Sequence, residues 1–110
     1  MARIRSVYFY KNNLYLYQLM LHYWQQRRLV LVTLSEALAI RVDELMKEKK
    51  LTQYRLAQLS GIAETTIADI RKMRNKGTNI QNINSIAQGM GMDLIQFFNS
   101  PLFKGENLTD

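Results

Sequence analysis

The stretch Leu51–Arg71, LTQYRLAQLSGIAETTIADIR, decides how the rest of the chain is organised. It predicts two short helices joined by a tight turn at Gly61, because glycine adopts a positive φ without a Cβ clash and so ends a helix abruptly. Ala57 is small where the second helix must cross the first closely. The residues predicted to pack inward are Leu56, Ala57, Leu59, Ile67 and Ile70. The residues predicted to face outward on the second helix are Glu64, Thr65, Ala68 and Asp69.

Two short helices in this arrangement form a helix-turn-helix, a motif whose second helix enters the DNA major groove. From Leu38 to Phe98 the chain also resembles the Xre/Cro-like helix-turn-helix family of bacterial and phage transcriptional regulators. The segments that carry the resemblance are Leu51-Thr52-Gln53, Leu56-Ala57, Gly61-Ile62, Thr66-Ile67, Ile86-Ala87 and Met90-Gly91-Met92. No single segment is specific, but their order and spacing together are.

The resemblance and the helical spacing predict an all-α fold: a five-helix repressor-like helix-turn-helix domain with an N-terminal aromatic-rich arm. We expect the arm at residues 1–32, the domain at residues 33–103 and a frayed tail at residues 104–110. Side chains that cap helix N-termini mark four helix starts. These are Thr33 with Glu36 in a capping box, Thr52, Thr78 with Gln81 in a second box, and Asp93. Pro101 is expected to stop the last helix.

The arm leaves several interpretations open. Residues 14–26 carry apolar side chains at helical spacing, which favours a helix, but residues 14–17 could instead form a hairpin with residues 7–10. Its aromatic stripe is more typical of a core or dimer interface than of a surface that binds bases. A further alternative is that these residues are upstream sequence translated from a misassigned start.

The charge distribution favours a polyanionic partner. The chain has a formal net charge of +6. Residues 1–34 contain five basic and no acidic groups, residues 41–77 nine basic and five acidic, and residues 78–110 one basic and three acidic. The positive charge therefore lies before and within the helix-turn-helix, as in proteins that bind nucleic acids.

Composition excludes several classes of protein. The chain has no cysteine, so it can form neither a disulfide nor a thiolate metal site, and a cytoplasmic location is expected. Arg27 and Arg28 interrupt the apolar segment Leu14–Leu34, which argues against a membrane span. The only histidine is His22, and no phosphate loop or nucleophile motif is present, so we expect no enzyme, no cofactor and no metal. A small-molecule effector is not expected either.

The resemblance also implies which residues contact DNA. Base contacts are implied for Glu64, Thr65, Ala68 and Asp69. Ionised carboxylates only accept hydrogen bonds, so Glu64 and Asp69 suit the cytosine N4 group. Phosphate contacts are implied or expected for Gln53, Arg71, Lys72, Arg74, Asn75 and Lys76.

The sequence departs from the family at three places. Many members pair an arginine late in the first helix with a glutamate after the recognition helix; the matching positions are Met46 and Arg71. We therefore expect that salt bridge to be absent and Arg71 to be free to face a phosphate. Lys72-Met73 replaces the usual Asn-Gly, which predicts a recognition helix about one turn longer. Ala63 replaces a Ser or Thr cap, at a cost of about 1 kcal/mol.

These inferences predict sequence-specific binding of double-stranded DNA by a transcriptional regulator, a repressor in the leading interpretation, with the helix at about residues 63–72 in the major groove. A homodimer is expected, because paired half-sites require two-fold symmetry. Its interface is expected to use Phe97, Phe98, Leu102 and Phe103, or the N-terminal aromatic residues. The alternative is a protein-interaction module, such as an antitoxin that binds a partner protein.

Overall fold

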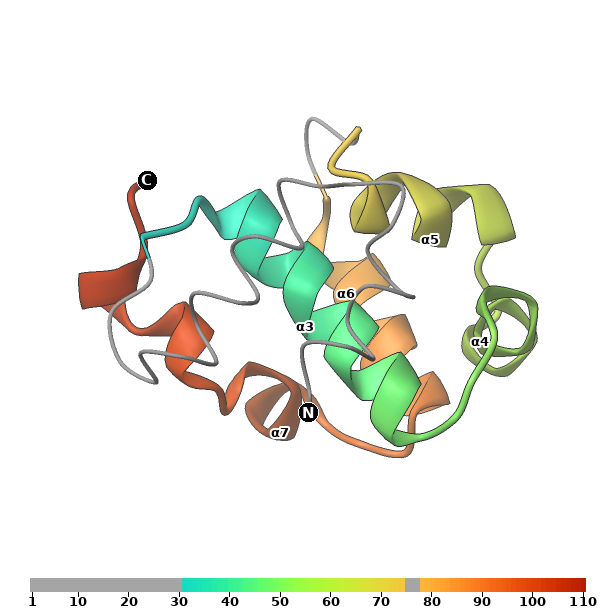
Figure 1. Ribbon diagram of the computed structural model, residues 1–110. Coiled ribbons are helices and arrows are strands. Elements are labelled where there is room, and N and C mark those ends of the chain that lie inside the picture. Colours follow the sequence, from blue (N-terminus) through green and yellow to red (C-terminus); the bar gives the residue numbers. More distant parts are fainter. Residues whose placement is uncertain (1–30, 75–77) are drawn as a thin grey trace.

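The computed structural model describes residues 31–74 and 78–110. The expected helix or hairpin of the arm, and the predicted phosphate contacts Asn75 and Lys76, lie outside the described residues. The described part contains five α-helices and two short 3-10 helices (Figure 1). They are α3 (Leu34–Glu48), α4 (Gln53–Ser60), α5 (Glu64–Arg71), α6 (Ile80–Gly89), α7 (Leu94–Phe98), η1 (Pro101–Phe103) and η2 (Gly105–Asn107). The all-α, five-helix prediction is confirmed.

The N-terminal caps largely follow the sequence pattern. The Thr33 hydroxyl accepts from the Glu36 amide and the Glu36 carboxylate accepts from the Thr33 amide, so the predicted capping box is present. Thr52 caps α4 and Asp93 caps α7 as predicted. The prediction for α6 was wrong by one residue: Asn79, not Thr78, caps the helix. Asn79 has an extended backbone, and its side-chain oxygen accepts from the Asn82 amide at 2.7 Å.

Three helices end in a Schellman motif, in which a residue with positive φ reverses the chain. Gly91 has φ +77°, whereas Lys50 and Met73 adopt φ values of +56° and +57° without being glycines. At the end of α5 the Met73 amide donates to Ile70 at 3.2 Å and the Arg74 amide to Asp69 at 2.9 Å. The expected extra turn of this helix is therefore absent, because Met73 closes the helix end in glycine's place.

The core consists of two clusters on either side of α3, which runs through the middle of the domain (Figure 1). The larger cluster joins α3 to the other four helices. Its buried members are Leu38, Val42, Leu45, Met46, Leu56, Ile67, Ile70, Ile83, Ile86, Ala87, Met90 and Phe97. The smaller cluster contains Val32, Ala37, Ala39, Ile40 and Leu102. Leu59 is 43% exposed, so its prediction as a core residue was wrong.

The C-terminal residues are packed rather than frayed, which corrects the expectation for residues 104–110. The Val32 amide donates to the Asn107 carbonyl at 2.9 Å, and the Thr109 amide donates back to Val32 at 2.9 Å. Asn107 is 2% exposed, and the Asp110 carboxylate accepts from the Leu34 amide at 2.8 Å. This pairing buries Val32 together with the smaller core cluster. Val32 therefore belongs to the folded domain and not to the arm.

Gly89→Ala tests the close crossing of α4 and α6. A Cβ at Gly89 would lie 3.0 Å from the Ser60 amide nitrogen and 3.1 Å from its Cα, which are backbone atoms that cannot rotate away. We expect the free energy of unfolding to fall by about 1–2 kcal/mol, even though alanine has the higher helix propensity. Urea denaturation measures this change in the free energy of unfolding. Gly105→Ala is the matched control, because its Cβ would meet nothing within 4 Å, and it should change stability little. A stabilised Gly89→Ala protein would contradict this packing.

Lys50→Gly tests the left-handed end of α3. Lys50 is exposed and strained at φ +56°, so glycine is expected to raise the free energy of unfolding by about 0.5–1 kcal/mol. Met73→Gly relieves the same strain but removes a side chain that packs on the smaller core cluster, so it should gain less or lose stability. Thermal melts of both variants against the parent protein make the comparison. Equal gains would show that Met73 contributes no packing.

Candidate nucleic-acid interface

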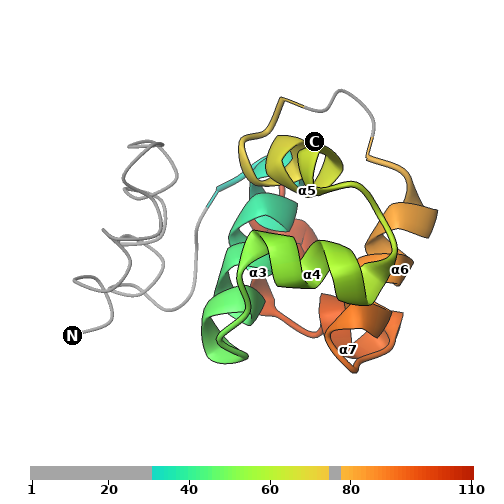
Figure 2. The same cartoon turned by 90° about the vertical axis from the view of Figure 1, so that its right-hand side faces the viewer.

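The candidate interface is the outward face of α5. The turn before α5 is tight as predicted: Gly61 has φ +75° and its amide donates to Ala57 at 2.9 Å. Ala63 precedes α5 without a side-chain cap, which confirms the missing cap. Ile67 and Ile70 are buried, so α5 lies against the core on one side only. Figure 2 shows α4 and α5 as separate helices that lie next to one another, and α5 also packs against α3.

The predicted base-contacting residues follow this orientation. Glu64 and Thr65 are exposed, and Ala68 and Asp69 are half-buried. The Asp69 carboxylate also accepts from Arg74, at 3.2 Å from Nε and 3.0 Å from Nη2. The Arg74 side chain is 60% exposed and the Asp69 side chain 43%, so solvent screens the pair and it contributes little to stability. Its consequence is local: part of the acidic charge on this face is balanced by a predicted phosphate-contacting residue.

Gln53, at the first position of α4, lies between two other predicted site residues. Its side-chain oxygen accepts from Nη1 of Arg71 at 3.0 Å. Its side-chain nitrogen donates to the Glu64 carboxylate at 3.4 Å. The structure therefore joins the start of α4, the start of α5 and the end of α5 through one amide. Lys72 is exposed just beyond this group.

The expectation that Arg71 is free was wrong. Nε of Arg71 donates to the Asp43 carboxylate of α3, and the side chains are 21% and 4% exposed respectively. Met46 is apolar and makes no such pair; the acidic partner of Arg71 is Asp43, three residues earlier and nearly one turn back along the helix. The ion pair thus has the opposite polarity to the one that the resemblance implies: the acid is on α3 and the base ends α5. Two of the five N–H donors of Arg71 are therefore used inside the protein, and its side chain is only 21% exposed.

Sequence reasoning missed Asp43, although a signal was available. Ala39, Asp43 and Met46 fall at helical spacing on one stripe, and an acidic residue in an otherwise apolar stripe needs a partner. Burial raises the pKa of Asp43 to about 6, against the opposing effect of the Arg71 guanidinium and its hydrogen bond. Burial also raises the pKa of the adjacent Glu44 to about 7, although Arg41 lies 3.7 Å away and lowers it.

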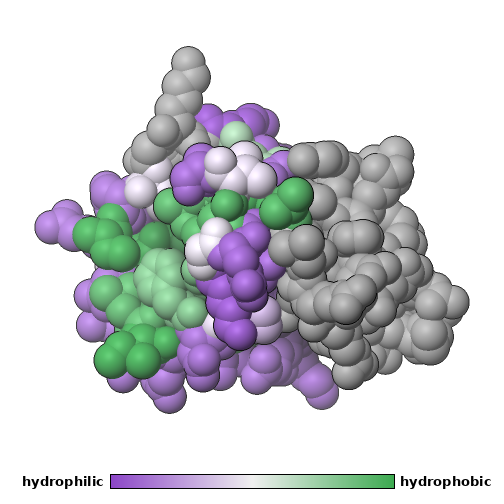
Figure 3. All heavy atoms as spheres, turned by 90° about the vertical axis from the view of Figure 1, so that its left-hand side faces the viewer, coloured by the Kyte–Doolittle hydropathy of each residue, from purple (hydrophilic) through white to green (hydrophobic). Residues whose placement is uncertain are grey.

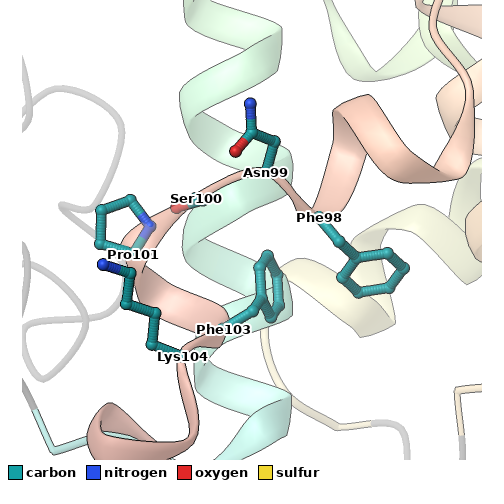
Figure 4. Close-up of a pocket in the computed structure, with 6 residues that line it drawn as sticks. All are labelled: Phe98, Asn99, Ser100, Pro101, Phe103 and Lys104. Carbon is teal, nitrogen blue, oxygen red and sulfur yellow. The ribbon is translucent and has the colours of Figure 1, made fainter.

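The residues expected at a dimer interface divide into two groups. Phe97 and Leu102 are 0% and 1% exposed, so they belong to the core and their prediction as interface residues was wrong. Phe98 and Phe103 are half-buried and pack edge to face, with ring centroids 4.8 Å apart. They border a surface pocket (Figure 4). Apolar side chains also gather on the face of the molecule drawn in Figure 3.

None of the described helices combines the length and apolar character required to cross a membrane. Residues 31–74 and 78–110 contain no group of three or more histidine, aspartate or glutamate side chains placed to hold a metal ion.

The helix α5 packs on the core by its inner face, and a glycine turn joins it to α4. This arrangement is that of the helix-turn-helix proteins. A family profile described as the Cro/C1-type HTH DNA-binding domain matches residues 41–99, and the chain belongs to that family. Comparison with curated proteins and with solved structures gives no match. Membership supports DNA binding in transcription regulation, and the family is typically non-enzymatic.

The raised carboxyl pKa values predict a pH dependence of stability. A carboxyl group whose pKa is higher in the folded than in the unfolded protein binds protons more tightly in the folded state. Its protonation therefore adds to the free energy of unfolding in full below about pH 4, and this contribution is lost as the pH rises through the folded-state pKa values of 6–7. We expect the free energy of unfolding to be about 1–2 kcal/mol higher at pH 5 than at pH 8, from urea denaturation. Glu44→Gln should reduce this difference, whereas Glu106→Gln, at an exposed position of η2, should leave it unchanged. A Glu44→Gln protein with the parent's full pH dependence would refute this assignment.

Proposed function

We propose that the protein binds a specific sequence of double-stranded DNA as a transcriptional repressor, with α5 in the major groove. The observation that carries the proposal is the orientation of α5: Ile67 and Ile70 bury one side while Glu64 and Thr65 are exposed on the other. Membership of the Cro/C1-type family supports the same docking mode.

The proposed base contacts come from the exposed side of α5. Glu64 and Asp69 accept hydrogen bonds from cytosine N4 groups, the Thr65 hydroxyl donates or accepts, and the Ala68 methyl contacts a thymine methyl. These residues bring two negative charges and no positive charge toward the DNA. Affinity therefore depends on the flanking groups that hold phosphates.

The proposed phosphate contacts are Gln53, Lys72, Arg74, Asn75 and Lys76. Gln53 lies at the start of α4, where the positive end of the helix dipole also favours a phosphate. Lys72 and Arg74 follow directly after α5 and are exposed. We leave Arg71 out of these contacts, because Asp43 and Gln53 hold its guanidinium inside the protein and its side chain is only 21% exposed.

We further propose that the protein binds as a homodimer in the cytoplasm, without a small-molecule effector. A single recognition helix makes few contacts, and two-fold symmetry places a second copy one helical turn along the duplex. The half-buried Phe98 and Phe103 are candidates for the interface, as are the aromatic residues of the N-terminal arm that precedes Val32. Symmetry in the recognised DNA reports this dimer directly.

Selection of bound duplexes from a random pool tests the proposal. The expected result is an enriched site with two related halves, bound with an affinity that falls steeply as salt rises, because phosphate contacts release counterions. Absence of any binding at low salt would overturn the proposal. It would favour the second candidate, in which the exposed acidic residues Glu64 and Asp69 face a protein partner.

Paired variants separate phosphate contacts from base contacts. Lys72→Ala should weaken all sequences similarly and lower the salt slope of the binding constant by about one, because one phosphate contact is lost. Thr65→Ala should instead relax the preference at one base pair and leave the slope unchanged. Fluorescence anisotropy on the selected duplex and on single-base variants measures both quantities.

Lys104→Ala is the matched control for Lys72→Ala: the same charge is removed from an exposed residue outside the proposed DNA contacts, so the slope should remain that of the parent. If Lys72→Ala and Thr65→Ala behaved alike, the proposed division of contacts would be wrong.

A further inference from the structure

We propose that Arg71 and Asp43 are positioning residues for base recognition: their buried ion pair orients the Gln53 amide, which in turn holds the Glu64 carboxylate where it meets a base. The proposal rests on the proposed function, in which Glu64 faces the major groove. It adds two residues that touch no DNA and a directed chain of hydrogen bonds that links them to one that does.

The first step is the fixed position of the guanidinium. Asp43 is 4% exposed on α3, and its carboxylate accepts from Nε of Arg71. The guanidinium is planar, so a bond at Nε sets the directions of the other N–H groups. Nη1 then points at Gln53, whose side-chain oxygen lies 3.0 Å away. A lysine could keep the charge pair but offers no such rigid fork.

The second step is the orientation of the Gln53 amide, which the neighbouring groups determine chemically. Arg71 can only donate, so it must face the oxygen of Gln53; an ionised Glu64 can only accept, so it must face the NH2 group. The bonds therefore run in one direction, from Arg71 through Gln53 to Glu64, with Asp43 behind Arg71. A flipped amide would place oxygen against carboxylate and NH2 against guanidinium, and it would lose both bonds.

The third step concerns the two hydrogens of that NH2 group. One is directed at Glu64 across 3.4 Å, and the second remains for another acceptor such as a phosphate oxygen. The same amide then links a phosphate contact to a base-reading carboxylate. Glu64 is exposed, so without this donor its long side chain would sample several rotamers, and base discrimination would weaken.

NMR on the full chain without DNA tests the chain of bonds directly. In the parent protein the Gln53 side-chain amide should be immobilised, with a high heteronuclear NOE. Arg71→Lys retains the pair with Asp43 and should melt close to the parent, yet the Gln53 amide should become mobile because the fork is gone. The Gln58 amide is the internal control: it bonds Tyr54 and Arg55 on the outer side of α4 and should not change. An equally rigid Gln53 amide in Arg71→Lys would overturn the proposal.

Binding measurements on a selected duplex test the consequence for specificity. Glu64→Gln should identify the base pair that this residue reads, with the parent discriminating there by ~10-fold or more. Arg71→Lys should reduce discrimination at the same base pair to less than ~3-fold, and the double variant should show no further loss, because both act through Glu64. A uniform loss of affinity for all sequences would assign Arg71 a merely structural role and overturn the proposal. If the parent bound no DNA, the proposed function would fail, while the NMR result would still decide the positioning of Gln53.

Discussion

The structure depends on how an eight-residue helix is held in place. An isolated helix as short as α5 is not stable in water, so its position and its existence both come from tertiary contacts. Ile67 and Ile70 supply the apolar part of these contacts, and they fix which face of α5 points outward. Apolar contacts are not directional, so they set the face of α5 but not the exact orientation of its end. The ion pair between Arg71 and Asp43 supplies the missing directional constraint, at the end of α5 away from the turn.

Burying an ion pair costs free energy, because both charges lose most of their hydration. A pair of well-packed apolar residues at these positions could stabilise the domain equally well, but it would not orient Gln53. The ion pair uses one N–H group of Arg71 to bind Asp43 on α3 and leaves another to bind Gln53 at the start of α4, which an apolar pair could not do. Stability and alignment of the outward face thus rest on the same side chain.

Features that the sequence predicted well are local ones. The Thr33 capping box, the Asp93 cap and the turn at Gly61 each depend on residues within four positions of one another, so a single short pattern reports them. The misses depend on distant contacts. Met73 adopts positive φ while packing on the smaller core cluster, and the C-terminal residues are ordered because they pair with Val32. Neither contact leaves a periodic signal in the chain.

In the candidate site, too, the local features were predictable from the sequence and the distant contacts were not. Helical periodicity placed Glu64 and Thr65 on the outward face of α5, because Ile67 and Ile70 fix the inward one. Periodicity could not show which of these residues are connected, because the bonds to Arg71 span 18 and 28 positions of sequence. Those bonds change the chemistry of the site. In the proposed docking mode, a free Arg71 would add positive charge toward the DNA, whereas a paired Arg71 leaves a face composed mainly of acceptors. Such a face would favour bases that present donors in the major groove, and the attraction for phosphates would then come from the residues after α5.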